Sequence, residues 1–331
     1  MNKEILRQTV TRLVAKPKGI LAIDESLSTC NKRFEKLGIS TTEEKRREYR
    51  ELLVTAPDIE KYISGYIIFN ETIRQKTLTG KNFTDILKLK GMEIGIKVDE
   101  GLVDLPDHPG EKFTQGLDGL AERLKEYKNM GATFAKWRVV YSISENTPSD
   151  LCMKTNAEIL AKYAAICQAR DLVPIVEPEV LLEGDHTLEK CYEVSAQNFK
   201  ILFIELKKFN VFLPGIVLKT SMVISGKNAG DRAPAEKIAE MTVKCLEEHV
   251  PKEVRGVVFL SGGQGDEEAV INLNAISKLK SSWHLTFSYG RAIQNPALKS
   301  WAKNPEDITG AQKLLVAAAR NNSLASVGQY K

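Results

Sequence analysis

The stretch "FLPGIVLKT", residues 212–220, ends an apolar run on a lysine, Lys219. Burying an ammonium group in an apolar strand is costly unless the group is paired or gives up its proton. Lys219 therefore either reaches water at the end of its strand or is held in the interior for a chemical purpose. The choice depends on the fold to which this strand belongs.

Seven other short, β-branched apolar runs resemble this one. They are "GILAIDES" (from Gly19), "ISGYIIFNE" (from Ile63), "EIGIKVDEG" (from Glu93), "ATFAKWRVV" (from Ala132), "LVPIVEPE" (from Leu172), "GVVFLSGG" (from Gly256) and "HLTFSYGRA" (from His284). Most are separated by segments of helical period, such as "NAEILAKYAAICQARD". Eight strand and helix units predict an α/β fold, a (β/α)8 TIM barrel of eight parallel strands with surrounding helices, in one domain over residues 1–331.

The alternative fold is a doubly wound open sheet. That fold favours a G-x-G-x-x-G sequence after an early strand. The nearest match, "SGGQG", follows the seventh run instead. The barrel is therefore the preferred prediction.

Composition excludes several functional classes. The net charge of +4 arises from 47 basic and 43 acidic residues without a block of like charges, which argues against a nucleic-acid partner. Five widely spaced cysteines without a C-x-x-C pair indicate free thiols of a reducing compartment. No apolar run approaches the roughly 18 residues that span a bilayer. We expect a cytoplasmic protein without a membrane partner.

Polar side chains cluster in the C-terminal halves of the eight runs. In a barrel, these strand ends face the mouth of the active site, and residues two apart share a face. The runs therefore predict a site that is rich in both signs of charge. Its members are Asp24, Lys97, Lys136, Arg138, Glu177, Glu179, Lys219, Ser261 and Ser288.

These residue types suggest a division of labour. Carboxylates and a buried lysine suit proton transfer and covalent chemistry, and a second cation nearby would favour the neutral, nucleophilic form of Lys219. Lys97, Arg138 and Arg291, together with the glycines of "SGG" and "SYGR", suit phosphate oxygens. The loops after strands seven and eight of a barrel are a frequent phosphate site.

Each feature also has a purely structural explanation. Lys219 alone could extend to solvent or pair with a carboxylate, and Glu177 and Glu179 could serve only as ion-pair partners. Asp24 could cap a helix that begins near Ser26, and "SGGQG" could be a simple turn. The four histidines lack metal-ligand spacing, so no metal site is expected.

Taken together, nine motifs resemble those of class I fructose-bisphosphate aldolases, in order, from about residue 17 to 330. They are "GILAIDES", "GIKVDEG", "TQGLDGL", "GATFAKWR", "PIVEPE", "LLEGDH", "GIVLKTSM", "FLSGGQGDEEA" and "LTFSYGRA". The resemblance implies reversible cleavage of fructose 1,6-bisphosphate to dihydroxyacetone phosphate and glyceraldehyde 3-phosphate in glycolysis and gluconeogenesis. It further implies a homotetramer and a covalent imine on Lys219, with no metal or other cofactor.

The resemblance also implies roles for individual residues. Glu177 would be the general acid and base for the carbinolamine, Asp24 would act on the C4 hydroxyl, and Lys136 and Glu179 would tune the charge around the imine. The phosphate at C1 would bind Ser261, Gly262, Ser288, Gly290 and Arg291. The far phosphate would bind Ser26, Arg33 and Lys97, with Arg138 as a further contact.

Other functions remain open at this stage. Sedoheptulose 1,7-bisphosphate and fructose 1-phosphate are alternative substrates, because the motifs define the reactive end better than the far end. A scaffold protein that binds acidic protein partners at the basic mouth is a second class. A transaldolase-like barrel would explain the lysine but not two phosphate sites.

Overall fold

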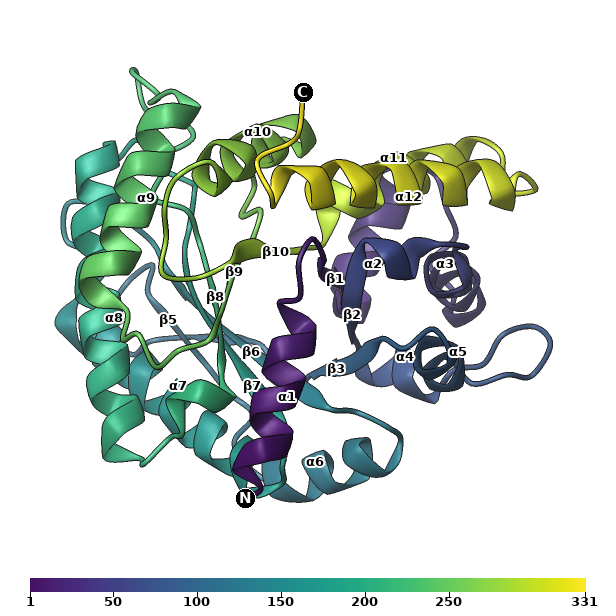
Figure 1. Cartoon of the computed structure of the whole chain (residues 1–331), viewed down its shortest axis with the longest axis horizontal. Helices are drawn as coiled ribbons and strands as arrows, with labels where there is room; N and C mark the ends of the chain where they lie inside the picture. Colours follow the sequence, from purple (N-terminus) through teal and green to yellow (C-terminus); the bar gives the residue numbers. More distant parts are fainter.

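The computed structural model describes residues 1–331, and eight parallel strands close into a barrel in the order β1-β10-β9-β8-β7-β6-β3-β2 (Figure 1). Each of the eight predicted runs coincides with one of these strands, although β6 and β7 extend one residue past their runs, and the TIM-barrel prediction is confirmed. The strands are β1 (Gly19–Ile23), β2 (Ile63–Ile68), β3 (Glu93–Lys97), β6 (Phe134–Tyr141), β7 (Val173–Val180), β8 (Val217–Thr220), β9 (Gly256–Phe259) and β10 (Leu285–Tyr289).

Helices surround the barrel and connect most consecutive strands (Figure 1). Several begin at a hydroxyl residue whose side chain accepts a hydrogen bond from the first turn, as Ser149 does from the Cys152 amide at 3.1 Å. The helices are α1 (Lys3–Leu13), α2 (Leu27–Glu35), α3 (Glu43–Thr55), α4 (Asn70–Arg74), α5 (Phe83–Leu89), α6 (Leu120–Asn129), α7 (Asp150–Ala169), α8 (Leu188–Lys208), α9 (Ala235–His249), α10 (Asp266–Ser277), α11 (Arg291–Lys303) and α12 (Ile308–Ala325), with 3-10 turns η1 (Ile59–Lys61) and η2 (Leu213–Gly215).

Helix α1 crosses the barrel and closes the N-terminal ends of its strands (Figure 1). Its fully buried Leu6, Val10 and Leu13 belong to a hydrophobic cluster inside the barrel, next to this helix. The strand residues in that cluster are Ile20, Ala22, Ile67, Phe134, Val173, Ile175, Val217 and Val258. Six of the eight strands thus pack apolar side chains together with α1 inside the barrel.

A small antiparallel hairpin of β4 (Leu102–Asp104) and β5 (Lys112–Thr114) follows β3. The sequence patterns predicted neither this hairpin nor α1. The hairpin matters for the site because Gly101 and Leu102, at its start, line the mouth of the barrel.

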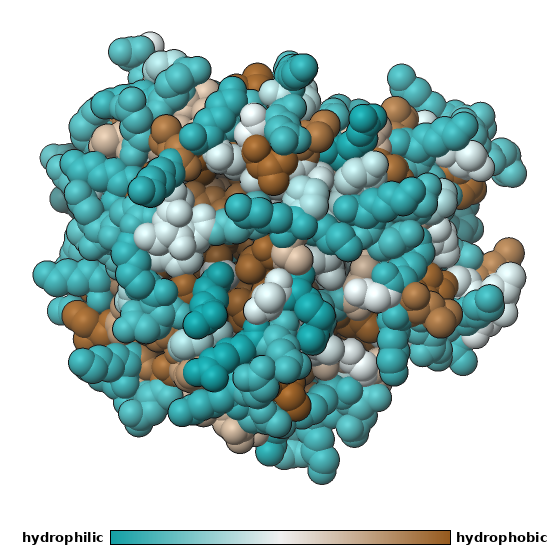
Figure 2. All heavy atoms as spheres, viewed as in Figure 1, coloured by the Kyte–Doolittle hydropathy of each residue, from teal (hydrophilic) through white to brown (hydrophobic).

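Polar side chains cover most of the molecular face drawn in Figure 2, and apolar side chains are scattered or lie in its recesses. All five cysteines are free and buried, in agreement with the expectation of free thiols. None of the helices has the length and apolar character that crossing a membrane requires.

Candidate active site

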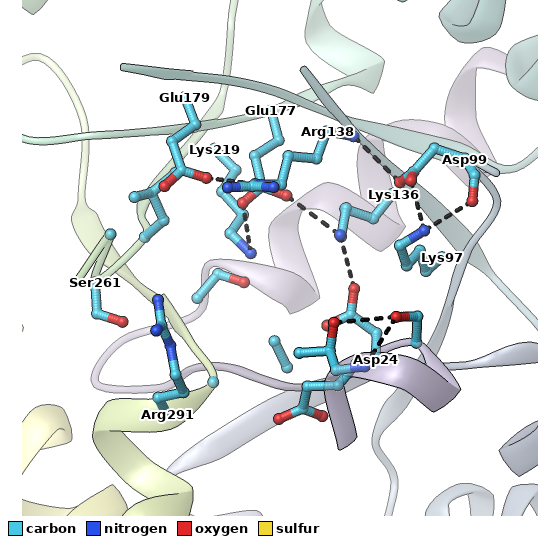
Figure 3. A pocket seen from close by; sticks show the side chains of 18 of the residues that line it. Asp24, Lys97, Asp99, Lys136, Arg138, Glu177, Glu179, Lys219, Ser261 and Arg291 are labelled. Atoms are coloured by element: carbon cyan, nitrogen blue, oxygen red, sulfur yellow. Dashed lines mark hydrogen bonds and ion pairs between the residues drawn. The ribbon is translucent and has the colours of Figure 1, made fainter. Parts of the chain in front are cut away.

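A cavity of about 580 Å³ opens at the C-terminal ends of the strands. Every residue to which the family resemblance gave a role lines it, whereas Gly263 of "SGG" does not, and Figure 3 shows ten of the lining side chains with labels. The predicted residues brought together here are Asp24, Ser26, Arg33, Lys97, Lys136, Arg138, Glu177, Glu179, Lys219, Ser261, Gly262, Ser288, Gly290 and Arg291.

Four charged side chains of alternating sign form a chain across the floor of this cavity (Figure 3). Lys219 Nζ on β8 lies 3.1 Å from Glu177 Oε1 on β7. Glu177 Oε2 lies 3.5 Å from Lys136 Nζ on β6, and Lys136 Nζ lies 2.7 Å from Asp24 Oδ2 after β1. The side chains of Lys219, Glu177 and Lys136 are at most 5% exposed, so these charges interact with little screening by water.

The charges of Asp24 and Lys136 stabilise each other. Burial alone would raise the pKa of Asp24, but Lys136 and Lys219 outweigh it and lower that pKa to about 2. Burial would lower the pKa of Lys136, but Asp24 and Glu177 raise it above the usual lysine value. At neutral pH, Asp24 is therefore an anion and Lys136 a cation.

Two further ion pairs stand beside this chain. Arg138 Nε donates to Glu179 Oε2, and burial, which opposes the charge, is outweighed by Glu179, so the pKa of Arg138 rises. Lys97 Nζ donates to the Asp99 carboxylate and, at 2.7 Å, to the Asp99 carbonyl oxygen. Asp99 was missed in the sequence, although it follows Lys97 by two residues in "GIKVDEG".

The loop after β9 and the C-terminal end of β10 each place a serine in the lining of the cavity. Ser261 and Ser288 are both buried, and the Ser288 hydroxyl has no partner. Gly262 has a left-handed backbone (φ 49°), and an added Cβ there would lie 2.7 Å from Leu260 Cδ1. Gly290 is the N-cap of α11, whose first residue, Arg291, is exposed. Glycine loops, free hydroxyls and a helix N-terminus together suit an anion such as phosphate.

The opposite end of the cavity is formed by β1 and α2. Ser26 is the N-cap of α2, and its Oγ accepts from the Thr29 amide at 3.4 Å. The hypothesis that Asp24 caps this helix is therefore wrong. Arg33 ion-pairs with Glu25, which the sequence reasoning missed. The exposed Lys32 and Lys36 also line the cavity, although "NKRFEK" looks like an ordinary solvated helix face.

No group of three or more His, Cys, Asp or Glu side chains converges in a way that would hold a metal ion. A TIM barrel that gathers lysines and carboxylates at the C-terminal ends of its strands is the arrangement of a barrel enzyme. The family model "Fructose-bisphosphate aldolase class-I" matches residues 5–331. The chain belongs to the class I fructose-bisphosphate aldolase family, and its activity is that of a lyase in glycolysis.

Individual relatives agree with this assignment. A probable fructose-bisphosphate aldolase class 1 from Xanthomonas campestris is 51% identical over 336 residues and covers 100% of both chains. The cytosolic fructose-bisphosphate aldolase 4 of Arabidopsis thaliana is 49% identical over 95% of this chain and 80% of its own. Among solved structures, the aldolase of Plasmodium falciparum, in complex with TRAP and a small-molecule inhibitor, superposes with a TM-score of 0.97 at 45% identity, covering 99% of this chain and 95% of its own.

Proposed function

We propose that Lys219 forms the Schiff base with the keto carbon of fructose 1,6-bisphosphate. The observation that carries this assignment is the 3.1 Å pair of Lys219 Nζ and Glu177 Oε1 inside the cavity. A lysine nucleophile needs a neighbour that takes its proton, because only the neutral amine attacks a carbonyl. Glu177 is within hydrogen-bond reach for that transfer.

Glu177 also serves the next step. After the amine adds to the keto carbon, the carbinolamine loses its hydroxyl as water, and Glu177 donates the proton that this departure requires. The product is a protonated imine next to the carbon that will lose the aldehyde.

Asp24 then acts as the base for carbon–carbon bond cleavage. The Asp24 carboxylate removes the proton of the C4 hydroxyl, the C3–C4 electron pair moves toward the imine, and glyceraldehyde 3-phosphate leaves. The electrons remain in an enamine, whose protonation and hydrolysis release dihydroxyacetone phosphate. The low pKa of Asp24, set by Lys136 and Lys219 against the effect of burial, keeps this carboxylate ionised in the resting enzyme. Lys136 and Glu179 complete the charge distribution around the imine.

Two phosphate groups orient the sugar in this scheme. We assign the C1 phosphate to the loops of Ser261, Gly262, Ser288, Gly290 and Arg291, and the far phosphate to Ser26, Arg33 and Lys97, with Arg138 as a further contact. Holding both ends of the substrate supplies orientation that lowers the barrier by several kcal/mol. Members of the class I family use a lysine Schiff base rather than a metal, and we propose the same for this chain, with no cofactor.

Borohydride trapping tests the assignment. The protein is reduced with sodium borohydride, with and without dihydroxyacetone phosphate, in the presence of a metal chelator, and the adduct is mapped by peptide mass spectrometry. An adduct on Lys219 that requires the sugar phosphate is expected. Absence of an adduct, or an adduct on Lys136 alone, would overturn the assignment.

We propose fructose 1,6-bisphosphate as the preferred substrate over sedoheptulose 1,7-bisphosphate and fructose 1-phosphate, because two basic clusters at opposite ends of one cavity suit two phosphates. Comparison of kcat/KM for the three sugars tests this preference. A higher value for either alternative would reassign the physiological substrate.

A second proposal concerns protein partners. The Plasmodium falciparum relative has been solved in complex with TRAP, and the exposed Lys32, Lys36 and Arg291 make the mouth of this chain basic. We propose that acidic protein segments bind at this mouth. Fructose 1,6-bisphosphate should then displace an acidic peptide in a fluorescence polarisation assay, whereas binding that is insensitive to the sugar would place the peptide elsewhere.

We also propose that residues 1–331 form one domain and assemble as a homotetramer. We further propose that the protein acts in the cytoplasm, because one relative, from Arabidopsis thaliana, is named as cytosolic. Light scattering coupled to size-exclusion chromatography measures the assembly directly. A monomeric mass at micromolar concentration would contradict the tetramer.

A further inference from the structure

A buried amide, Gln294, joins four parts of the molecule behind the far end of the cavity. It is 0% exposed and lies in α11, three residues after Arg291. Its Nε2 donates to the Ala22 carbonyl at 2.6 Å and to Glu25 Oε1 at 2.9 Å. Its Oε1 accepts from Tyr49 OH at 2.9 Å and from Arg33 Nη1 at 3.0 Å. Both donors and both lone pairs of the amide are therefore used.

Glu25 is the second member of this arrangement. Its carboxylate accepts from Gln294, from Arg33 and, at 2.9 Å, from Arg50 Nη2. Burial would raise the pKa of Glu25, but Arg50 and Arg33 outweigh burial and lower it. A charged Glu25 and a neutral Gln294 therefore hold the same Arg33 nitrogen, Nη1, from two directions.

Arg33 is held in place by protein contacts but keeps free hydrogen-bond donors. Three of its five N–H groups have protein acceptors, namely Glu25, Gln294 and, at 3.3 Å, Asn295 Oδ1. The Nε–H and one Nη2–H remain without a protein partner, and Arg33 lines the cavity. A guanidinium that keeps two free N–H groups can donate hydrogen bonds to the oxygens of a phosphate.

The neighbouring amide extends the arrangement to the loop after β9. Asn295 Nδ2 donates to Asp266 Oδ1 at 2.9 Å, and Asp266 is the first residue of α10, directly after "SGGQG". The pair Gln294 and Asn295 thus connects Arg33 with both loops that we assign to the C1 phosphate.

We propose that Gln294, together with Glu25, is a positioning residue that orients Arg33 for the far phosphate and thereby sets the preference for ketose bisphosphates over ketose monophosphates. A free arginine must lose many rotamers when it binds a ligand, and fixed contacts remove that cost beforehand. This inference rests on the proposed function, because it uses the assignment of the far phosphate to Arg33.

The test compares Gln294→Leu with Gln168→Leu. Gln168 is also buried in a helix, and its side chain bonds the Phe212 carbonyl, the Gly215 carbonyl and the Phe212 amide, but it lies in α7 and lines no part of the cavity. Each variant is assayed for kcat and KM with fructose 1,6-bisphosphate and with fructose 1-phosphate, which has no far phosphate.

For Gln294→Leu, we expect kcat/KM on the bisphosphate to fall about tenfold or more, mainly through KM, because a hydrogen bond to a charged group is lost. The value on the monophosphate should change by less than about threefold. Gln168→Leu should leave the ratio of the two values unchanged. Equal losses of Gln294→Leu on both sugars would overturn the inference, because they would indicate a general structural role.

Arg33→Ala separates failure of this inference from failure of the proposed function. Arg33→Ala should lower the ratio of kcat/KM on the bisphosphate to kcat/KM on the monophosphate at least as far as Gln294→Leu does. The double variant that combines both substitutions should show no further change in this ratio. If Arg33→Ala does not shift the ratio, the assignment of the far phosphate to Arg33 is wrong, and the inference about Gln294 is then wrong as well. If Arg33→Ala shifts the ratio and Gln294→Leu does not, only the inference is wrong.

Two further measurements cover a variant that folds poorly. Asn295→Ala removes one weaker contact to Arg33 from a half-buried position, and a smaller shift in the same direction is expected. Borohydride trapping of dihydroxyacetone phosphate on Lys219 shows whether the reactive end of each variant is intact. A normal adduct with an unchanged sugar preference in Asn295→Ala and Gln294→Leu would overturn the inference.

Discussion

Lys219 Nζ lies 3.1 Å from Glu177 Oε1, on adjacent strands of the barrel, and neither side chain is more than 5% exposed. The lysine that ends "PGIVLK" therefore does not extend to solvent. Its burial is offset by a carboxylate whose second oxygen is 3.5 Å from Lys136. One glutamate thus stands between two amines, in the place where a proton has to be moved if Lys219 attacks a carbonyl.

The first prediction concerns the amine itself. Lys219→Met keeps the length and apolar part of the side chain and removes the nucleophile, so we expect cleavage of fructose 1,6-bisphosphate to fall at least about a thousandfold. Steady-state cleavage assays measure this, and circular dichroism checks that the variant folds. A variant with wild-type activity would place the nucleophile elsewhere.

The second prediction concerns proton transfer. Glu177→Gln still accepts a hydrogen bond from Lys219 but cannot carry a proton, so kcat should fall about 10²- to 10⁴-fold. Borohydride should still find the adduct on Lys219 after long incubation, because the amine remains. An unchanged kcat would show that another group, or water, moves the proton.

The sequence predicted the strands well for a physical reason. Parallel strands that are covered on both faces read as continuous apolar runs, and the polar residues at their ends are then conspicuous. Lys136, Glu177 and Lys219 were found in this way. The sequence could not predict that these charges form a chain of alternating sign. That chain depends on the register that sets Arg138 opposite Glu177 and on the rotamers that turn Lys136 toward Asp24.

The features that the sequence did not reveal depend on contacts between distant segments. Helix α1 buries Leu6, Val10 and Leu13 in an otherwise largely polar segment, and nothing local indicates that it closes a barrel. Strands β4 and β5 have three residues each, too few for a periodic signal. Gln294 bonds Glu25 across 269 positions, and a glutamine in a helix is otherwise an ordinary surface residue.

The third prediction concerns pH. The pKa of Asp24 is lowered from 3.8 to about 2, so its ion pairs stabilise the fold at pH values above about 4, and this contribution is lost as the pH falls toward 2. The free-energy difference between the wild type and Asp24→Asn, on the order of 2 kcal/mol at pH 7, should therefore shrink below pH 4. Urea unfolding between pH 7 and 3 measures it.

The exposed Asp118 supplies the control for that experiment. Asp118→Asn makes the same exchange at an aspartate without an ion pair, so it should not reproduce the pH-dependent difference expected for Asp24→Asn. A difference between the wild type and Asp24→Asn that grew as the pH fell would contradict the ion pairing described for Asp24.

The fourth prediction separates stability from catalysis. Leu6 is fully buried in the cluster at the N-terminal end of the barrel, away from the cavity. Leu6→Ala should lower the free energy of unfolding by about 2–5 kcal/mol, because it removes apolar contacts and leaves a void. We expect kcat at 25 °C to stay within about twofold of the wild type. A large loss of kcat in the folded variant would show that α1 communicates with the site.

The last prediction tests the loop after β9. Gly262 has φ 49°, a left-handed conformation that alanine adopts only with strain, and a Cβ there would approach Leu260 Cδ1 to 2.7 Å. Gly262→Ala therefore strains the backbone of the loop that carries Ser261 and displaces the Leu260 side chain. Gly265→Ala is the matched control in the same loop, since Gly265 has φ −59° and its nearest neighbour to an added Cβ is 3.9 Å away.

If this loop holds the C1 phosphate, Gly262→Ala should raise KM about tenfold for fructose 1,6-bisphosphate and for fructose 1-phosphate alike, because both sugars carry that phosphate. Inorganic phosphate should also become a weaker inhibitor of this variant. Gly265→Ala should remain within about twofold of the wild type on both sugars. An increase in KM for fructose 1,6-bisphosphate alone would instead indicate that the C1 phosphate does not bind at this loop.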